Sequence, residues 1–131
     1  MANFEATTAS NDAKIKEGKE AEVKALLEKY NTTSEVEVRI EGGTICIYGY
    51  DWMQFYRPED TLDYVDATED FLTELAPLLE SPLLIHCVGA TKCRFPLSAM
   101  EVLVQPPRKG FPDGLVEWGG FEFQEDGSQK N

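Results

Sequence analysis

The chain has 131 residues, of which 42% are hydrophobic and 11% aromatic, and it carries a formal net charge of −12. This length and apolar content are sufficient for one domain with a hydrophobic core that needs no metal or disulfide to fold. The charge argues against direct nucleic-acid binding, since that binding draws on basic side chains that displace counterions.

The hydropathy and the two ends define the expected setting of the chain. No apolar run is long enough to cross a bilayer, and the N-terminus lacks the charged and apolar pattern of a secretory signal. We therefore expect a cytoplasmic protein without membrane contact. Both ends are small and polar, so we predict a single domain over residues 1–131 with flexible ends at about 1–11 and 124–131.

A first helix is predicted over Asp12–Tyr30. Its apolar residues recur at the three- and four-residue spacing of one helical face. They are Ile15, Val23, Leu26, Leu27 and Tyr30. Gly18 weakens the middle of this segment, so its early turn can be a separate piece.

The stretch Glu35–Trp52 predicts a β-hairpin. Two alternating apolar runs flank Gly42 and Gly43, which can adopt the positive φ angles of a two-residue turn. This turn gathers the apolar residues of both strands on one face. The expected pairs are Val36 with Gly49, Val38 with Ile47 and Ile40 with Ile45. The aromatic residues within Tyr48–Trp52 then point to the other face, which is typical of a central strand.

A second helix is predicted to begin at Asp66-Ala67-Thr68-Glu69, which has the form of a capping box. One apolar stripe follows at helical spacing. It contains Phe71, Leu72, Leu75, Leu78 and Leu79. Because Pro77 interrupts this stripe, we expect a kink or a restarted turn at Ala76-Pro77.

Strands are predicted at Leu83–Val88 and Met100–Gln105, both short and largely apolar. The connection between them is too long for a tight turn, and its basic and aromatic residues fit either a functional or an ordinary surface loop. A last hairpin is predicted over Leu115–Phe123, with its turn at Gly119-Gly120.

This order of elements predicts an α+β fold, with an antiparallel sheet of about four to six strands and two helices packed on one face. The helices should cover the face lined by apolar residues of the first hairpin. The opposite face, which carries Tyr48 and Tyr50, should be either covered by the last hairpin or open as a contact surface.

The cysteines and the single histidine are the candidates for chemistry. Cys46, Cys87 and Cys93 have no repeated spacing, which is typical of free thiols in a reducing compartment. Cys93 beside Arg94 is the best nucleophile, with His86 as its base, because a thiolate needs a basic or cationic neighbour. The spacing matches no zinc motif, and common nucleotide and hydrolase signatures are absent, so we predict no metal and no cofactor, and catalysis is the weaker interpretation.

The strongest functional signal is an aromatic run beside an acidic stretch. Residues 51–80 hold nine acids and one base. Tyrosine and tryptophan dominate protein-binding hot spots, although rings of a sheet core are commoner still. The predicted partner-binding residues are Tyr48, Tyr50, Trp52, Tyr56, Asp63, Asp66, Asp70 and Glu74.

We therefore predict a small acidic, non-enzymatic interaction module that binds a basic protein surface through an acidic aromatic face. Inhibitors, immunity or anti-defence proteins, adaptors and proteins that imitate nucleic-acid charge all fit this description. The alternative is a thiol-dependent enzyme or small-ligand binder centred on Cys93 and His86. A third interpretation treats the acidity as an adaptation to salt. The oligomeric state stays open, with a dimer among the options.

Overall fold

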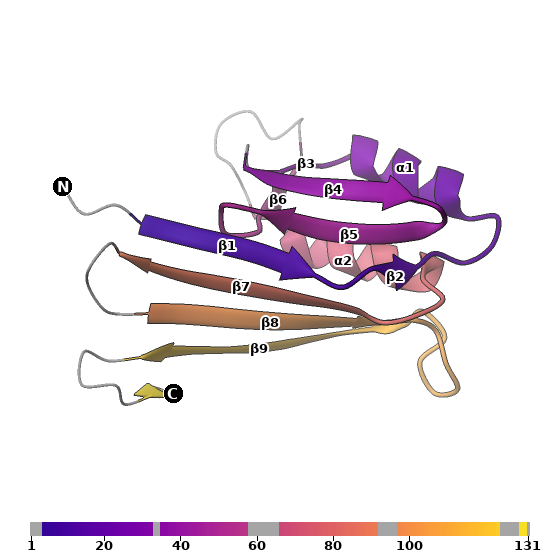
Figure 1. The fold of residues 1–131 in the computed structure, drawn as a ribbon. Coiled ribbons are helices and arrows are strands. Elements are labelled where there is room, and N and C mark those ends of the chain that lie inside the picture. The colour runs from indigo at the N-terminus through magenta and orange to yellow at the C-terminus, as the bar shows by residue number, and fades with distance from the viewer. Residues whose placement is uncertain (1–3, 33–34, 58–65, 92–96, 124–128, 131) are drawn as a thin grey trace.

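The computed structural model describes residues 4–32, 35–57, 66–91, 97–123 and 129–130. Within these ranges the chain forms one large sheet, a small two-stranded sheet and a helical layer (Figure 1). The elements in chain order are β1 (Phe4–Ser10), β2 (Ala13–Lys14), α1 (Glu20–Glu28), β3 (Asn31–Thr32), β4 (Val36–Glu41), β5 (Thr44–Gly49), β6 (Phe55–Tyr56), α2 (Thr68–Leu75), the 3₁₀ turn η1 (Ala76–Leu78), β7 (Leu83–Thr91), β8 (Leu97–Gln105), β9 (Leu115–Phe123) and β10 (Gln129–Lys130).

The large sheet has the strand order β10-β9-β8-β7-β1-β5-β2, and β4 pairs with β5 as well. All of its recorded pairs are antiparallel. Strands β1 and β2 follow each other along the same side of β5, where β1 meets Tyr48 and β2 meets Ile45. The α+β class is confirmed, and the strand number is close to the predicted one, with the excess coming mainly from the start of the chain.

The first hairpin has the predicted register. Val38 pairs with Ile47 and Ile40 pairs with Ile45. Gly42 and Gly43 adopt φ angles of 60° and 78°, as the two-residue turn requires. The hairpin could be predicted because its apolar alternation and its turn residues lie within one short stretch.

Residues 4–10, which lie in the predicted flexible start, form β1 between β7 and β5. The inward side of this strand carries Ala6 and Thr8, both buried. These side chains are small, so the strand lacks the large apolar residues that mark a buried strand in a sequence. Thr8 Oγ1 instead donates a hydrogen bond to the carbonyl oxygen of Asp51, at 2.6 Å.

The predicted helix over Asp12–Tyr30 is half as long in the structure. Its first part is β2, and Ile15 forms an isolated bridge to Leu79. Gly18 has a φ of 81° and separates this part from α1. The remaining stripe is confirmed, because Val23, Leu26 and Tyr30 are buried against the sheet.

Helix α2 begins two residues after Asp66. The carboxylate of Asp66 accepts hydrogen bonds from the backbone N–H and the hydroxyl of Thr68, at 2.9 and 2.5 Å. This contact replaces the predicted capping box, since Glu69 takes no part in it. The predicted restart at Pro77 is confirmed, because the α-helix ends at Leu75 and η1 follows it.

The last predicted hairpin is wrong: residues 115–123 form the single strand β9, paired with β8 along its whole length. Gly119 and Gly120 lie opposite Glu101 and Met100 and are not among the glycines with positive φ. A pair of glycines permits a turn but does not require one. Here pairing with a nine-residue neighbour decides the conformation.

Both helices lie on the far side of the sheet in Figure 1, so the view looks onto the other face. The core lies between these layers, and its largest fully buried side chains come from both. They include Phe55, Phe71, Ile45, Ile47, Leu72 and Leu75. Phe55 and Phe71 stack with ring centroids 4.0 Å apart. The helices are thus confirmed on one face, and no described helix covers the other.

Candidate functional site

The face of the sheet turned away from the helices is the first candidate site. The strand registers join one row across it, from Tyr48 through Ala9 and His86 to Glu101. Side chains two residues apart on a strand share a face, which extends this surface along each strand. We call it the open face and define it by Ala9, Glu37, Arg39, Tyr48, Leu84, His86, Val88 and Glu101.

Apolar side chains are unusually exposed on the open face. Tyr48 and Leu84 are each 36% exposed, and Val88 is 43% exposed. Tyr50, just beyond β5, is 82% exposed. Ala9 lies between Tyr48 and β7, and His86 lies between Leu84 and Val88. Several exposed apolar groups on one face favour a contact surface, whereas single ones are ordinary.

Charged groups flank these apolar side chains. A hydrogen bond between Glu37 and the Tyr48 hydroxyl raises the pKa of that tyrosine above its ordinary value. The guanidinium of Arg39 lies over the same ring, 5.9 Å from its centroid. Nδ1 of His86 is 3.1 Å from Oε1 of Glu101 on the next strand. The open face therefore combines apolar and acidic groups, with Arg39 as its one permanently cationic member.

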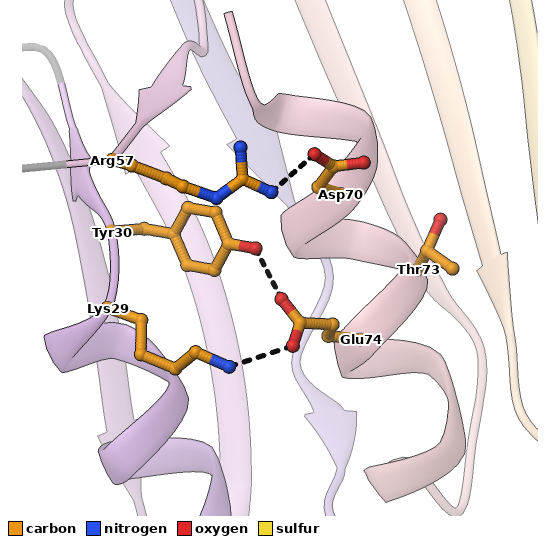
Figure 2. A pocket seen from close by; sticks show the side chains of 6 residues that line it. All are labelled: Lys29, Tyr30, Arg57, Asp70, Thr73 and Glu74. Carbon is orange, nitrogen blue, oxygen red and sulfur yellow. Dashed lines mark hydrogen bonds and ion pairs between the residues drawn. The ribbon is translucent and has the colours of Figure 1, made fainter. Parts of the chain in front are cut away.

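A second candidate site is a hollow of about 340 Å³ on the helical side. Its lining residues are Lys29, Tyr30, Arg57, Asp70, Thr73 and Glu74 (Figure 2). They come from the end of α1, from the residue after β6 and from α2. Figure 2 shows Arg57 above the Tyr30 ring and pointing to Asp70, with Glu74 between Tyr30 and Lys29.

Ion pairs and hydrogen bonds join these groups to one another. Arg57 donates to Asp70 at 2.6 Å, and Lys29 Nζ donates to Glu74 Oε1 at 2.9 Å. The hydroxyl of Tyr30 donates to the other oxygen of Glu74. Both carboxylates therefore already have cationic partners within the molecule.

The pKa shifts in this hollow follow from the same contacts. Burial, followed by the hydrogen bond to Glu74, raises the pKa of Tyr30 from 10.0 to about 12. The hydrogen bonds from Tyr30 and Lys29 hold the pKa of Glu74 below its ordinary value. The hydrogen bond to Asp70 raises the pKa of Arg57 above its ordinary value. Each group is thus stabilised in the protonation state that it has at neutral pH, which favours a structural clamp between α1, β6 and α2 over acid–base chemistry.

The structure divides the predicted partner-binding residues between the two layers. Tyr48 is on the open face, and the predicted acids of α2 are in the helical layer. Trp52 and Tyr56 are half-buried, and Trp52 packs against the core. Asp63 lies outside the described residues. Tyr48 and the acids of α2 therefore lie on opposite faces of the large sheet.

The predicted acids of α2 and Asp66, just before it, also have structural partners. Asp66 binds Thr68, Asp70 binds Arg57, and Glu74 binds Lys29 and Tyr30. A carboxylate with a cationic partner in the same molecule has less to gain from a second cation, because the two partners compete for it. The open face and its own acids are the better-placed candidates.

The structure describes only some of the residues predicted for thiol chemistry. Cys93 and Arg94 lie outside the described residues. His86 is exposed on the open face, whereas Cys87 is buried on the inner face, with Sγ 3.3 Å from Thr8 Oγ1. Adjacent strand residues thus point to opposite faces, as expected. Within the described ranges, no three or more His, Cys, Asp or Glu side chains gather as metal ligands would.

Sequence reasoning missed the contributions of Leu84, Val88, Glu37 and Glu101 to a surface. Leu84 and Val88 belong to a continuous apolar run, which predicts a strand buried on both faces. The even positions of this run are exposed because no described element covers them. A signal was present at Glu101, a charged residue within an apolar strand, since such a residue marks the solvent side.

Comparison with known proteins gives no relative: no family model matches the chain, and no curated protein or solved structure is similar to it. In the described part of the chain, none of the helices has the length and apolarity needed to span a membrane. The arguments for function therefore rest on the two sites themselves.

Proposed function

We propose that the protein is a small non-enzymatic interaction module that binds a basic protein surface through its open face. Inhibitors, immunity or anti-defence proteins and cytoplasmic adaptors all belong to this class. The observation that carries the proposal is the exposure of Tyr48, Leu84 and Val88 on one sheet face that no described helix covers. Tyr48 is an aromatic anchor of the kind that dominates binding energy, and Leu84 and Val88 add exposed apolar area to the same face.

The charge of the chain supports a basic partner. A net charge of −12 produces a negative potential around the molecule. Such a potential raises association rates with a cationic partner by roughly 10- to 1,000-fold at low salt. Glu37 and Glu101, which flank the exposed apolar side chains, would then orient the bound partner.

The decisive experiment compares exposed apolar side chains on the open face with one of similar exposure elsewhere. The double substitution Tyr48→Ser and Val88→Ser removes anchors from the open face, whereas Phe111→Ser removes a side chain that is 41% exposed in the connection between β8 and β9. Affinity capture from an extract of the source cells, with the bound proteins quantified, is the readout. We expect the double variant to lose about tenfold or more of the captured partner and Phe111→Ser to retain it.

Neutralising acids in each layer distinguishes binding by the open face from binding by the helical layer. We expect Glu37→Gln with Glu101→Gln to weaken capture and to reduce its salt dependence. The matched control is Asp70→Asn with Glu74→Gln, which removes two acids of the helical layer. Loss of capture in the control, with full capture in the open-face variant, would contradict the proposal and assign binding to α2.

A further inference from the structure

Strand β4 forms an edge of the sheet, because among the described strands it pairs with β5 alone. In Figure 1 it is the uppermost strand of the large sheet, with α1 drawn above and behind it. Val38 and Ile40 on its inner side are half-buried, and both pack against the core. An edge of this length offers unpaired backbone groups to another strand.

The hairpin register fixes which backbone groups point outward from the edge. In a hairpin with a two-residue turn, the residues flanking the turn form a hydrogen-bonded pair, and every second pair repeats this. Glu41, Arg39 and Glu37 therefore bond to β5, and the alternate residues of β4 point their N–H and C=O groups away. The carbonyl oxygen of Val36 confirms this direction, since it accepts a hydrogen bond from Thr32 Oγ1 at 3.0 Å.

We propose that β4 pairs with β4 of a second copy of this chain, antiparallel and centred on Val38, to form a symmetric dimer with one continuous sheet. In this register Val38 faces Val38 of the partner, and Val36 and Ile40 face each other. All three outward-pointing residues of each strand then face backbone groups of the partner. The carbonyl oxygen of Val36 would share this bond with the one it already accepts from Thr32 Oγ1.

The side chains favour this register over its neighbours. Centring the pair on Val38 sets Glu37 of each chain opposite Arg39 of the other, in the closely spaced positions where cross-strand pairs interact best. Centring it on residue 37 sets Glu37 against Glu37, and centring it on residue 39 sets Arg39 against Arg39. Both shifts also reduce the number of outward-pointing residues that find a partner.

The opposing electrostatic terms are weaker at physiological salt. Glu35 and Glu41 meet at the two ends of the paired strands, and each copy carries a net charge of −12. At about 0.15 M salt the Debye length is about 8 Å, so repulsion between distant charges of the two copies is largely screened. The contact pairs persist, and they are attractive between Glu37 and Arg39 and repulsive between Glu35 and Glu41. Arg39 can reach its contact with Glu37, because its side chain is 57% exposed. Its existing ion pair with Glu41 is long, with 3.9 Å between Nε and Oε2.

The dimer changes the surface available to a partner. Antiparallel pairing within one sheet places the two-fold axis normal to the sheet, so both open faces lie on the same side. The two surfaces then join into one continuous platform. The proposed dimer depends on the β4 edge and not on the identity of any partner of the open face, although Glu37 and Arg39 belong to both surfaces.

Charge reversal tests the register. The measurement is the molar mass of the folded chain over a dilution series at physiological salt, by sedimentation equilibrium. We expect wild-type mass to rise toward twice the 14.7 kDa of one chain. Glu37→Arg alone and Arg39→Glu alone each place like charges opposite each other and should weaken association by about tenfold or more. The double variant with both changes should restore it.

A backbone substitution provides a second test. The N–H of Val38 points out of the edge, so Val38→Pro removes a donor that the hairpin itself does not use. We expect this variant to keep its circular dichroism spectrum and to be monomeric. A wild-type mass of one chain at every concentration would overturn the proposal. A dimer that the single reversals leave intact, or that the double reversal fails to restore, would overturn it equally.

Discussion

At the scale of single residues, Gly49 shows how closely β4 and β5 approach. A Cβ atom built on Gly49 would lie 1.9 Å from the carbonyl oxygen of Glu35 and 2.7 Å from the Cα of Val36. Both atoms are backbone, so the contact cannot be relieved by a side-chain rotation. We expect Gly49→Ala to lower the free energy of unfolding by about 1–3 kcal/mol, the usual cost of overpacking.

Urea unfolding of Gly49→Ala measures this cost, and Gly119→Ala is the matched control. Gly119 is also a strand glycine, but a Cβ there meets no heavy atom within 4 Å. Its substitution should leave stability within about 0.5 kcal/mol of wild type or raise it slightly. Equal losses in both variants would mean that the close approach at Gly49 is not the cause.

Ionisation of Tyr30 should make the stability of the fold depend on pH in the alkaline range. Its pKa is raised to about 12 in the folded protein, whereas the unfolded chain ionises near 10.0. Between these values the folded state holds the proton and the unfolded state has lost it, so stability falls as pH rises from 10 to 12. Below pH 10 this group contributes no pH dependence. We expect Tyr30→Phe to show a shallower decline of unfolding free energy over this window.

Urea unfolding at several alkaline pH values is the measurement for Tyr30→Phe. Tyr48→Phe is a comparison on the other face and should change the decline in the same direction, because the pKa of Tyr48 is also raised, mainly by Glu37. A decline in Tyr30→Phe as steep as in wild type would show that the phenol titrates alike in both states.

At the scale of elements, β1 and the first hairpin mark the limit of prediction from the sequence. The hairpin is local: its turn and both apolar runs lie within one short stretch. The partners of β1 are distant along the chain, since Thr8 pairs with Cys87 and Gly49. Its buried residues are small, so neither periodicity nor proximity identifies it.

The difference between local and tertiary information also explains which parts of the two candidate sites could be predicted. The acids of α2 were identifiable as a charged group, but their pairing with Arg57 and Lys29 depends on how α1, β6 and α2 pack. The exposure of Val88 likewise depends on which sheet face the helices cover. Residue type is local information, whereas the contacts that decide a role are tertiary.

The two faces of strand β1 should differ in how well they tolerate a charged residue. Ala6 is buried on the inner face and Thr7 is exposed on the outer one. Ala6→Asp places an unpaired carboxylate in the core and should lower the free energy of unfolding by about 3 kcal/mol or more. Thr7→Asp should cost about 0.5 kcal/mol or less. Thermal and urea unfolding measure both, and equal tolerance would contradict the assignment of β1 to the middle of the sheet.

At the scale of the whole molecule, the charge of −12 affects stability as well as binding. Acids that repel one another destabilise the compact state, and salt relieves this repulsion. The Debye length falls to about 10 Å at 0.1 M and about 3 Å at 1 M, so most of the relief comes at low salt. Urea unfolding should therefore give a free energy that rises steeply up to about 0.2 M sodium chloride and levels off beyond it. A steep rise continuing to molar salt would instead indicate adaptation to brine.

Substitution of Glu28 tests whether repulsion between acids causes the rise of unfolding free energy with salt at low salt concentration. It is the last residue of α1, where the helix dipole disfavours an acid, and its side chain is exposed. We expect Glu28→Gln to raise the free energy of unfolding by about 0.3–1 kcal/mol at low salt and to lose this gain at molar salt. Glu22→Gln is the matched control, because Glu22 lies in the first turn and pairs with Lys19 at 3.2 Å. It should change stability in the opposite direction, and gains of equal sign in both variants would mean that net charge alone, irrespective of position, governs the stability of this fold.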